Sequence, residues 1–191
     1  MNIYFTAPIR GIKDIDPYLR EIHETITKLG HTHVDDYINR INKGQDFYEK
    51  LNDGGQKAYG RYYSKTLDSI LKADINIFDC SIASLGIGFQ IEKSLAYNKP
   101  TIVLYFKNHA PHFFIGITNE KFFVREYNER NVRSVVKDAI ENAQHVNEKR
   151  FNFFISPSLL AYLEEESNIQ GVTKSAYVRH LIIEDWKRKR K

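Results

Sequence analysis

Apolar residues recur with two different spacings along residues 1–143, one typical of strands and the other of helices. Short apolar or alternating stretches predict strands, and apolar residues three or four positions apart predict helices between Gly, Pro and Asn positions. The predicted strands cover residues 2–6, 31–34, 74–79, 101–106 and 121–125. The predicted helices cover residues 18–29, 58–72, 84–97 and 132–143.

Strands and helices alternate in this order, which predicts an α/β fold with a Rossmann or flavodoxin-like, doubly wound parallel sheet. Ligands of such sheets bind outside the carboxyl ends of the strands, where helices begin. Two loops meet this condition, residues 6–11 after the first predicted strand and residues 80–88 after the third. The polar segment 42–57 contains three glycines and is expected to be a mobile loop, long enough to act as a lid.

The second of these loops continues into a run from Ser84 to Gln90 that favours a ligand site. Gly86 and Gly88 would let a ligand approach the backbone closely. Ser84 places a hydroxyl near a helix N-terminus, where free N–H groups and the helix dipole favour an anion. Close packing of the helix on a strand would explain the two glycines equally well, so the spacing alone leaves both interpretations open.

Two segments resemble the nucleoside 2-deoxyribosyltransferase superfamily. Residues 4–11, Tyr-Phe-Thr-Ala-Pro-Ile-Arg-Gly, resemble its first-strand motif and are closest to the branch of deoxynucleoside 5′-monophosphate N-glycosidases. Residues 73–79 and then 84–89 resemble its second block, and Asn-Lys-Pro at 98–100 matches the segment after that block. The resemblance covers roughly residues 1–143 and implies a nucleotide or a nucleotide-derived small molecule as the ligand.

The resemblance assigns expected roles to matching residues. Tyr4 matches an aromatic residue that packs near the sugar and base. Arg10 matches an arginine that helps to hold the 5′-phosphate, a role that suits a bidentate guanidinium. Ser84 matches the phosphate-contacting serine of the monophosphate branch, and Gly86 and Gly88 match as backbone positions.

The departures from the family pattern concern catalysis. The glutamate nucleophile of the family is replaced by Gln90, and the aspartate that protonates the departing base is replaced by Thr66. Pro8, a candidate ligand-binding position, replaces a serine of the phosphate loop. The nearest acids, Glu92 and Asp68, each lie two residues away on another helix face. Because a carboxamide cannot form the glycosyl-enzyme ester, we expect binding without turnover. An active deoxyribosyltransferase or nucleotide N-glycosidase with an altered constellation is the alternative.

Histidine and cysteine positions add little further chemistry. His112 matches a region that reaches into the partner subunit's site, although an ordinary loop histidine is equally compatible with its position. His31 and His33 lack the Cys or acidic partners of a metal site, so we predict no metal and no other cofactor. Cys80 follows an apolar strand and is expected to be buried. A single cysteine excludes an internal disulfide and suits a reducing cytoplasm.

The pattern changes after the first predicted domain, residues 1–145. A strand is predicted over residues 150–155, a helix over 156–168 with Ser at its N-cap, and a second helix from residue 173. One strand and two helices are too few to bury an adequate core alone. The order resembles a ribbon-helix-helix module of the Arc repressor type, which predicts a second domain over residues 149–191 that dimerises.

The ribbon-helix-helix resemblance implies paired strands in the DNA major groove, and DNA is therefore a candidate partner. Residues 146–191 carry nine Lys and Arg against six Asp and Glu, so +3 of the net charge of +4 lies there and favours a polyanion. The candidate DNA contacts are Arg150, Asn152 and Phe154 on the strand and Thr173, Lys174 and Ser175 at the second helix. A dimerisation module that does not bind DNA is the alternative.

Together these features predict a catalytically degenerate nucleotide-binding domain in a ligand-responsive, DNA-binding regulator. An assembly or sensing protein is a third interpretation. Two self-association surfaces would give a homodimer, or a tetramer if they do not coincide. The longest apolar run of the parallel-sheet pattern, residues 102–106, is far too short for a membrane span, and no signal peptide is recognisable. A cytoplasmic protein is therefore expected.

Overall fold

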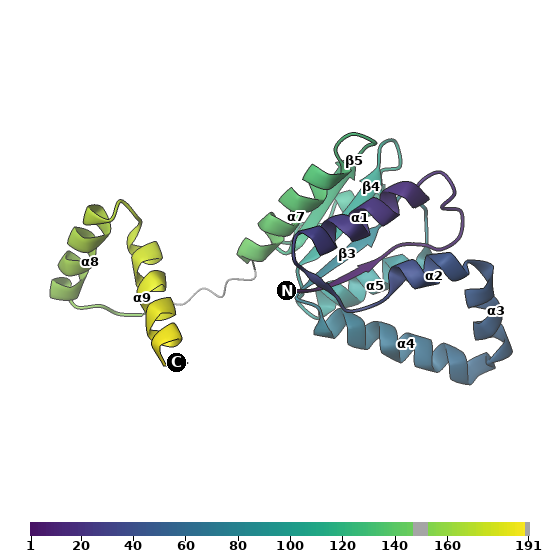
Figure 1. Cartoon of the computed structure of the whole chain (residues 1–191), viewed down its shortest axis with the longest axis horizontal. Coiled ribbons are helices and arrows are strands. Elements are labelled where there is room, and N and C mark those ends of the chain that lie inside the picture. The colour runs from purple at the N-terminus through teal and green to yellow at the C-terminus, as the bar shows by residue number, and fades with distance from the viewer. Residues whose placement is uncertain (147–152, 190–191) are drawn as a thin grey trace. The chain divides into compact units, whose positions relative to one another are not determined.

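The computed structural model describes residues 1–146 and 153–189, and the chain divides into two compact units, Met1–Lys149 and Arg150–Lys191 (Figure 1). The first unit contains a sheet of five parallel strands in the order β2-β1-β3-β4-β5. The strands are β1 Asn2–Thr6, β2 Thr32–His33, β3 Ile75–Asp79, β4 Thr101–Phe106 and β5 Phe122–Tyr127.

This strand order is the doubly wound order of flavodoxin-like folds, and it confirms the predicted fold class. The chain first moves from β1 to β2 at one edge, and then crosses to β3 on the other side of β1. The change of direction lies between β1 and β3, which pair with Tyr4 opposite Asn76 and Thr6 opposite Phe78. Loops that leave these two strands therefore diverge and leave room for a ligand at the carboxyl edge.

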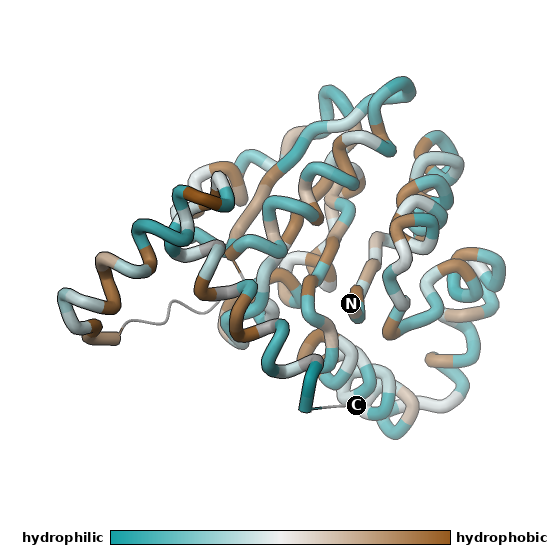
Figure 2. The backbone as a smooth tube through the Cα atoms, turned by 60° about the vertical axis from the view of Figure 1, so that its left-hand side comes forward, coloured by the Kyte–Doolittle hydropathy of each residue, from teal (hydrophilic) through white to brown (hydrophobic). Residues whose placement is uncertain are grey.

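Helices cover both faces of the sheet because each buries an apolar stripe, visible as alternating brown and teal segments in Figure 2. One core lies between the sheet and helices α1 and α7, and the other between the sheet and helices α4 and α5. The helices of this unit are α1 Asp16–Lys28, α2 Tyr37–Lys43, α3 Gln45–Asp53, α4 Gly55–Lys72, α5 Leu85–Ala96, α6 His112–Ile115 and α7 Val132–Val146.

The expectation of a mobile loop over residues 42–57 is wrong. That segment holds the end of α2, all of α3 and the start of α4, with single glycines between the helices. Gly44 (φ +50°) and Gly55 (φ +53°) adopt backbone conformations that suit glycine. The glycines that indicated a loop therefore mark sharp corners between helices, and Figure 1 shows α3 as a short link at the end of α4.

The second unit consists of α8 Pro157–Ile169 and α9 Lys174–Arg188. The Ser156 hydroxyl accepts a hydrogen bond from the N–H of Leu159 (3.4 Å), and Gly171 (φ +65°) follows α8. The predicted strand positions 150–152, which include Arg150 and Asn152, lie outside the described residues. Phe154 has no strand structure and is fully exposed. The ribbon-helix-helix assignment thus stays a prediction.

Within the described ranges, no helix combines the length and the apolar character that crossing a membrane requires.

Candidate functional site

The loops after β1, β3 and β4 meet at the carboxyl edge of the sheet. Gly11 (φ +74°) turns the chain after β1, and a Cβ placed on it would lie 3.7 Å from Cγ2 of Ile82 in the loop after β3. Ser84 then caps α5, its hydroxyl accepting a hydrogen bond from the N–H of Ile87 at 3.4 Å. Both loops selected from the sequence are therefore neighbours at one end of the sheet.

A cavity of about 420 Å³ lies between the loop after β3 and the loop after β4. It is lined by Ser84 and Gly88 from the start of α5 and by His112 from the start of α6, so three of the predicted ligand-binding residues share it. Cys80 also lines it, and burial raises the pKa of its thiol to about 12, which removes nucleophilic character at neutral pH.

Tyr4 and Gln90 form a direct hydrogen bond beneath these loops. The Tyr4 hydroxyl donates to Oε1 of Gln90 at 2.8 Å, and both residues are buried, with exposed fractions of 2% and 8%. Burial raises the pKa of Tyr4 to about 12, so the phenol remains a neutral donor. A carboxylate at position 90 could accept the same hydrogen bond, since amide and carboxylate oxygens are both acceptors.

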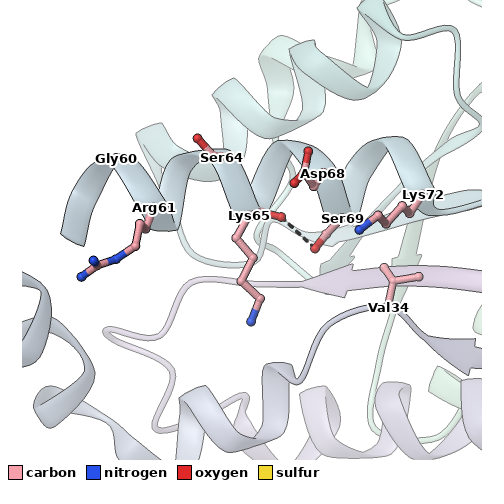
Figure 3. Close-up of a pocket in the computed structure, with 8 residues that line it drawn as sticks. All are labelled: Val34, Gly60, Arg61, Ser64, Lys65, Asp68, Ser69 and Lys72. Carbon is pink, nitrogen blue, oxygen red and sulfur yellow. Dashed lines mark hydrogen bonds between the residues drawn. The ribbon is translucent and has the colours of Figure 1, made fainter. Parts of the chain in front are cut away.

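Glu92 and Asp68, the acids nearest in sequence to Gln90 and Thr66, do not face the Tyr4–Gln90 hydrogen bond. Glu92 is exposed on α5, and Asp68 is exposed on α4, as expected from their spacing. Thr66, at the position of the family's proton donor, is half-buried and lines a separate, smaller cavity. A shallow depression of about 490 Å³ beside Val34 is lined by Asp68 and by basic side chains of α4 (Figure 3), of which Lys65 lies 3.7 Å from Oδ1 of Asp35. It includes none of the predicted ligand-binding residues.

The β1 loop is held from the side by aromatic residues of α2 and α3. The Tyr37 hydroxyl donates to the carbonyl oxygen of Pro8 at 3.1 Å, which fixes the buried Pro8. The guanidinium carbon of Arg10 lies 4.0 Å from the centroid of the Tyr48 ring. Stacking on an aromatic face leaves the edge N–H groups of an arginine available for a ligand.

An ion pair that the sequence did not indicate lies on the other side of Tyr4. Arg40 of α2 is paired with Asp35, and its Nη2 donates to the Thr6 hydroxyl at 3.2 Å. The two side chains are only 12% and 7% exposed. They contribute to a cavity of about 170 Å³ whose lining also includes Tyr62 and Thr66. No motif surrounds Asp35 or Arg40, so only the fold brings them to the site.

A buried carboxylate stabilises the loop after β3. Asp79 accepts hydrogen bonds from the Tyr127 hydroxyl (2.8 Å) and from the N–H of Ser81 (2.9 Å), and burial raises its pKa to about 6. Nδ1 of His109 lies 3.0 Å from the Ser81 carbonyl oxygen, which joins the loop after β4 to the same network. This network supports the wall of the larger cavity and is structural.

Comparison with known proteins agrees with this geometry, although no family model matches the chain. A 2′-deoxynucleoside 5′-phosphate N-hydrolase 1 of Syntrophotalea carbinolica is 29% identical over 105 residues, which are 55% of this chain and 68% of that protein. The protein of the same name in Thermofilum pendens is 25% identical over 148 residues, covering 74% of this chain and 91% of the relative. The chain contains a nucleoside 2-deoxyribosyltransferase-like domain.

Two further similarities concern this deoxyribosyltransferase-like domain. The 5-hydroxymethyl-dUMP N-hydrolase of Danio rerio is 26% identical over 148 residues, covering 74% of this chain and 96% of that protein. Among solved structures, a CMP N-glycosidase of Clostridium botulinum superposes with a TM-score of 0.48 at 10% identity, covering 74% of this chain and 98% of that one. The three curated relatives are nucleotide N-hydrolases by name.

Proposed function

We propose that the deoxyribosyltransferase-like domain binds a nucleoside or deoxynucleoside 5′-monophosphate and leaves its glycosidic bond intact. The observation that carries this proposal is the buried hydrogen bond from the Tyr4 hydroxyl to the amide oxygen of Gln90. The relatives are named as hydrolases of nucleotide N-glycosidic bonds, so a nucleotide is the ligand class that the resemblance supplies.

Two missing charges argue against turnover. A retaining N-glycosidase needs an anionic oxygen to attack the anomeric carbon and form an ester, and the neutral carboxamide of Gln90 cannot do this. The departing base also needs a proton donor, and Thr66 offers only a hydroxyl that does not titrate in water. The buried acid on that side, Asp35, is engaged in its ion pair with Arg40.

The phosphate-binding part of the site retains suitable groups. The N-terminus of α5 presents backbone N–H groups beside the Ser84 hydroxyl, an arrangement that favours an anion. Arg10 extends from the neighbouring loop with its guanidinium stacked on Tyr48. A cation on one loop and a helix N-terminus after the neighbouring loop are well suited to a 5′-phosphate. Gly88 and His112 line the cavity beside Ser84, and Gly86 lies between Ser84 and Gly88 in the first turn of α5.

Calorimetric titration of the full chain with a panel of nucleoside and deoxynucleoside monophosphates tests this function, with free-base release followed in parallel by chromatography. We expect saturable binding of at least one monophosphate with no released base. Multiple turnovers of any panel member would overturn the claim of binding without cleavage, and the absence of any binding would overturn the ligand class.

We also propose that the C-terminal unit joins two copies of the chain and holds DNA, so that nucleotide binding regulates a DNA-bound protein. Support comes from the apolar side chains that α8 and α9 leave exposed on their own: Leu159, Leu160, Ile169, Leu181 and Ile182. Thr173, Lys174 and Ser175 lie at the start of α9, where N–H groups can hold phosphate, although Lys174 also pairs with Glu164 at 2.5 Å.

Fluorescence anisotropy with labelled duplex DNA over a series of salt concentrations tests this second proposal. Binding through phosphate contacts weakens steeply as salt rises. We expect such a dependence, and a reduced slope for Lys174→Ala. Undetectable DNA binding at low salt by a chain that still dimerises would leave the C-terminal unit as a dimerisation module.

A further inference from the structure

We propose that the Asp35–Arg40 ion pair recognises the base of the bound nucleotide and selects bases that carry an exocyclic amine together with a hydrogen-bond acceptor, namely cytosine, guanine and adenine, over uracil and thymine. The proposal rests on the nucleotide-binding function proposed above, because it assigns the base to the cavity of about 170 Å³ on the α4 side of Tyr4.

The smaller cavity lies on the Tyr4 side of β1. Arg40 lines the cavity and donates to the Thr6 hydroxyl at 3.2 Å, two residues along β1 from Tyr4. Side chains two positions apart on a strand point to the same side of the sheet, so Arg40 and Tyr4 lie on the same side of β1. The cavity therefore lies on the side of the sheet that holds the Tyr4–Gln90 hydrogen bond, whereas the phosphate-binding groups at Ser84 lie in the other cavity.

The size and walls of the cavity suit a planar ring. Pockets for complete ligands commonly enclose about 300–1,000 Å³, so a cavity of about 170 Å³ holds one part of a nucleotide. Phe47 and Tyr62 line it, with ring centroids 5.4 Å apart and planes at 73°. Aromatic side chains are the usual stacking partners of nucleic-acid bases.

Fold stability alone does not account for the ion pair. Asp35 and Arg40 are almost completely removed from water, and taking two charges out of water costs about as much as their attraction returns. Apolar residues of similar volume are often as stabilising as such a pair. Recognition of a polar ligand better explains a buried ion pair that lines a cavity on the Tyr4 side of the sheet.

The hydrogen-bonding capacities of the pair define the base. Arg40 can only donate, and it retains N–H groups beyond those directed to Asp35 and the Thr6 hydroxyl. Asp35 as a carboxylate can only accept, and its Oδ1 also lies 3.7 Å from Nζ of Lys65, a longer contact than a hydrogen bond. A matching edge needs an acceptor for the guanidinium and an amine for the carboxylate, and cytosine, guanine and adenine present both.

Uracil and thymine fit this pair less well, because they have no exocyclic amine. Their single ring N–H lies between two carbonyl oxygens, whose lone pairs would repel a carboxylate that accepted from it. The charged pair therefore favours cytosine, guanine and adenine over uracil and thymine.

The test is competitive calorimetry of the wild-type full chain with the monophosphates of cytosine, guanine, adenine and uracil. We expect the cytosine, guanine and adenine nucleotides to bind at least about tenfold more tightly than the uracil nucleotide. A uracil nucleotide that binds as tightly as these would overturn base selection while leaving nucleotide binding intact. If no monophosphate binds, the proposed function fails, and this inference fails with it.

Variants assign the selectivity to the pair. Asp35→Asn introduces an amide that can donate, so the preference for cytosine, guanine and adenine over uracil should fall by about tenfold. Arg40→Lys keeps the positive charge but loses the planar guanidinium with its paired N–H groups. This variant should bind all four monophosphates more weakly, with little change in the melting temperature. Arg133→Lys, in an exposed ion pair with Glu21, is the matched control and should leave the ranking unchanged. The wild-type ranking decides the proposal even if a variant fails to fold.

Discussion

The hydroxyl of Tyr4 donates a hydrogen bond of 2.8 Å to the side-chain oxygen of Gln90, across 86 positions of sequence. The bond orients the amide as it would orient a carboxylate, since both groups present an acceptor oxygen to the phenol. Tyr4 therefore holds the Gln90 side chain where a glutamate at this position could accept the same hydrogen bond.

Restoring the two acids should restore base release. Gln90→Glu replaces the amide with an isosteric carboxylate within reach of Tyr4, and slow release of free base from a bound monophosphate is the expected result. Adding Thr66→Asp supplies a proton donor, which typically contributes about 10²–10⁴-fold to rate. Chromatographic detection of free base measures both steps.

Glu92→Gln provides the control for the restored site, because Glu92 is exposed on another face of α5. It should not change the rate of the double variant. A double variant that binds nucleotides with wild-type affinity and still releases no base would contradict the assignment of positions 90 and 66 to the family's two acids.

Removing the Tyr4 hydroxyl should destabilise the fold. In Tyr4→Phe the buried oxygen of Gln90 loses its hydrogen-bond donor, which typically costs about 1–3 kcal/mol of unfolding free energy. Urea denaturation measures this difference. Tyr63→Phe removes a hydroxyl from a half-exposed ring on α4 and should change the stability by less than about 0.5 kcal/mol. Equal effects of the two substitutions would argue against the buried bond.

Much of the sheet could be predicted because four of its strands, β1, β3, β4 and β5, are short and mainly apolar segments, and the longer helices have a clear 3.6-residue period. The segment 42–57 was mispredicted since Gly44 and Gly55 usually mark loops, whereas here their positive φ angles form corners between helices. The contacts of Phe47 and Tyr48 with Tyr62 and Arg10 stabilise these short helices, and such contacts depend on tertiary packing.

The residues of the candidate site were predicted where they lie in a family motif. They were missed where they lie on a helix or loop that has no motif. Tyr4 and Gln90 were both identified from motifs, but their direct bond depends on how α5 packs on β1. Arg40 and Asp35 lie in a segment with no spacing signal, and only the position of α2 after the two-residue β2 brings them to Thr6.

Stacking on Tyr48 should position Arg10 for phosphate. Tyr48→Leu removes the aromatic face, and a cation–π contact at an exposed site is worth about 0.5–1 kcal/mol, or roughly 2–5-fold in affinity. The loss should appear for a nucleoside monophosphate and be absent for the corresponding nucleoside, as measured by calorimetry. Tyr48→Phe keeps the ring and should bind normally. Equal losses of affinity for the nucleotide and the nucleoside would show that Tyr48 does not act on phosphate binding.

The buried Asp79 should make stability depend on pH in the weakly acidic range. Burial raises its pKa from 3.8 to about 6, so between these values the unfolded chain releases a proton that the folded chain retains. The contribution of the Asp79 carboxyl to the free energy of unfolding is therefore fully present below about pH 4. It is lost as pH rises through about 6, by about 3 kcal/mol.

Asp79→Asn mimics the protonated form and lacks this dependence. Urea denaturation should show the variant gaining about 2 kcal/mol relative to wild type between pH 4 and pH 7, because part of the change lies below pH 4. Asp138→Asn, on the exposed face of α7, should show no such gain. A stability difference between Asp79→Asn and wild type that is constant across this range would mean that Asp79 is ionised in the folded protein at pH 4, with its charge stabilised by the hydroxyl of Tyr127 and the N–H of Ser81.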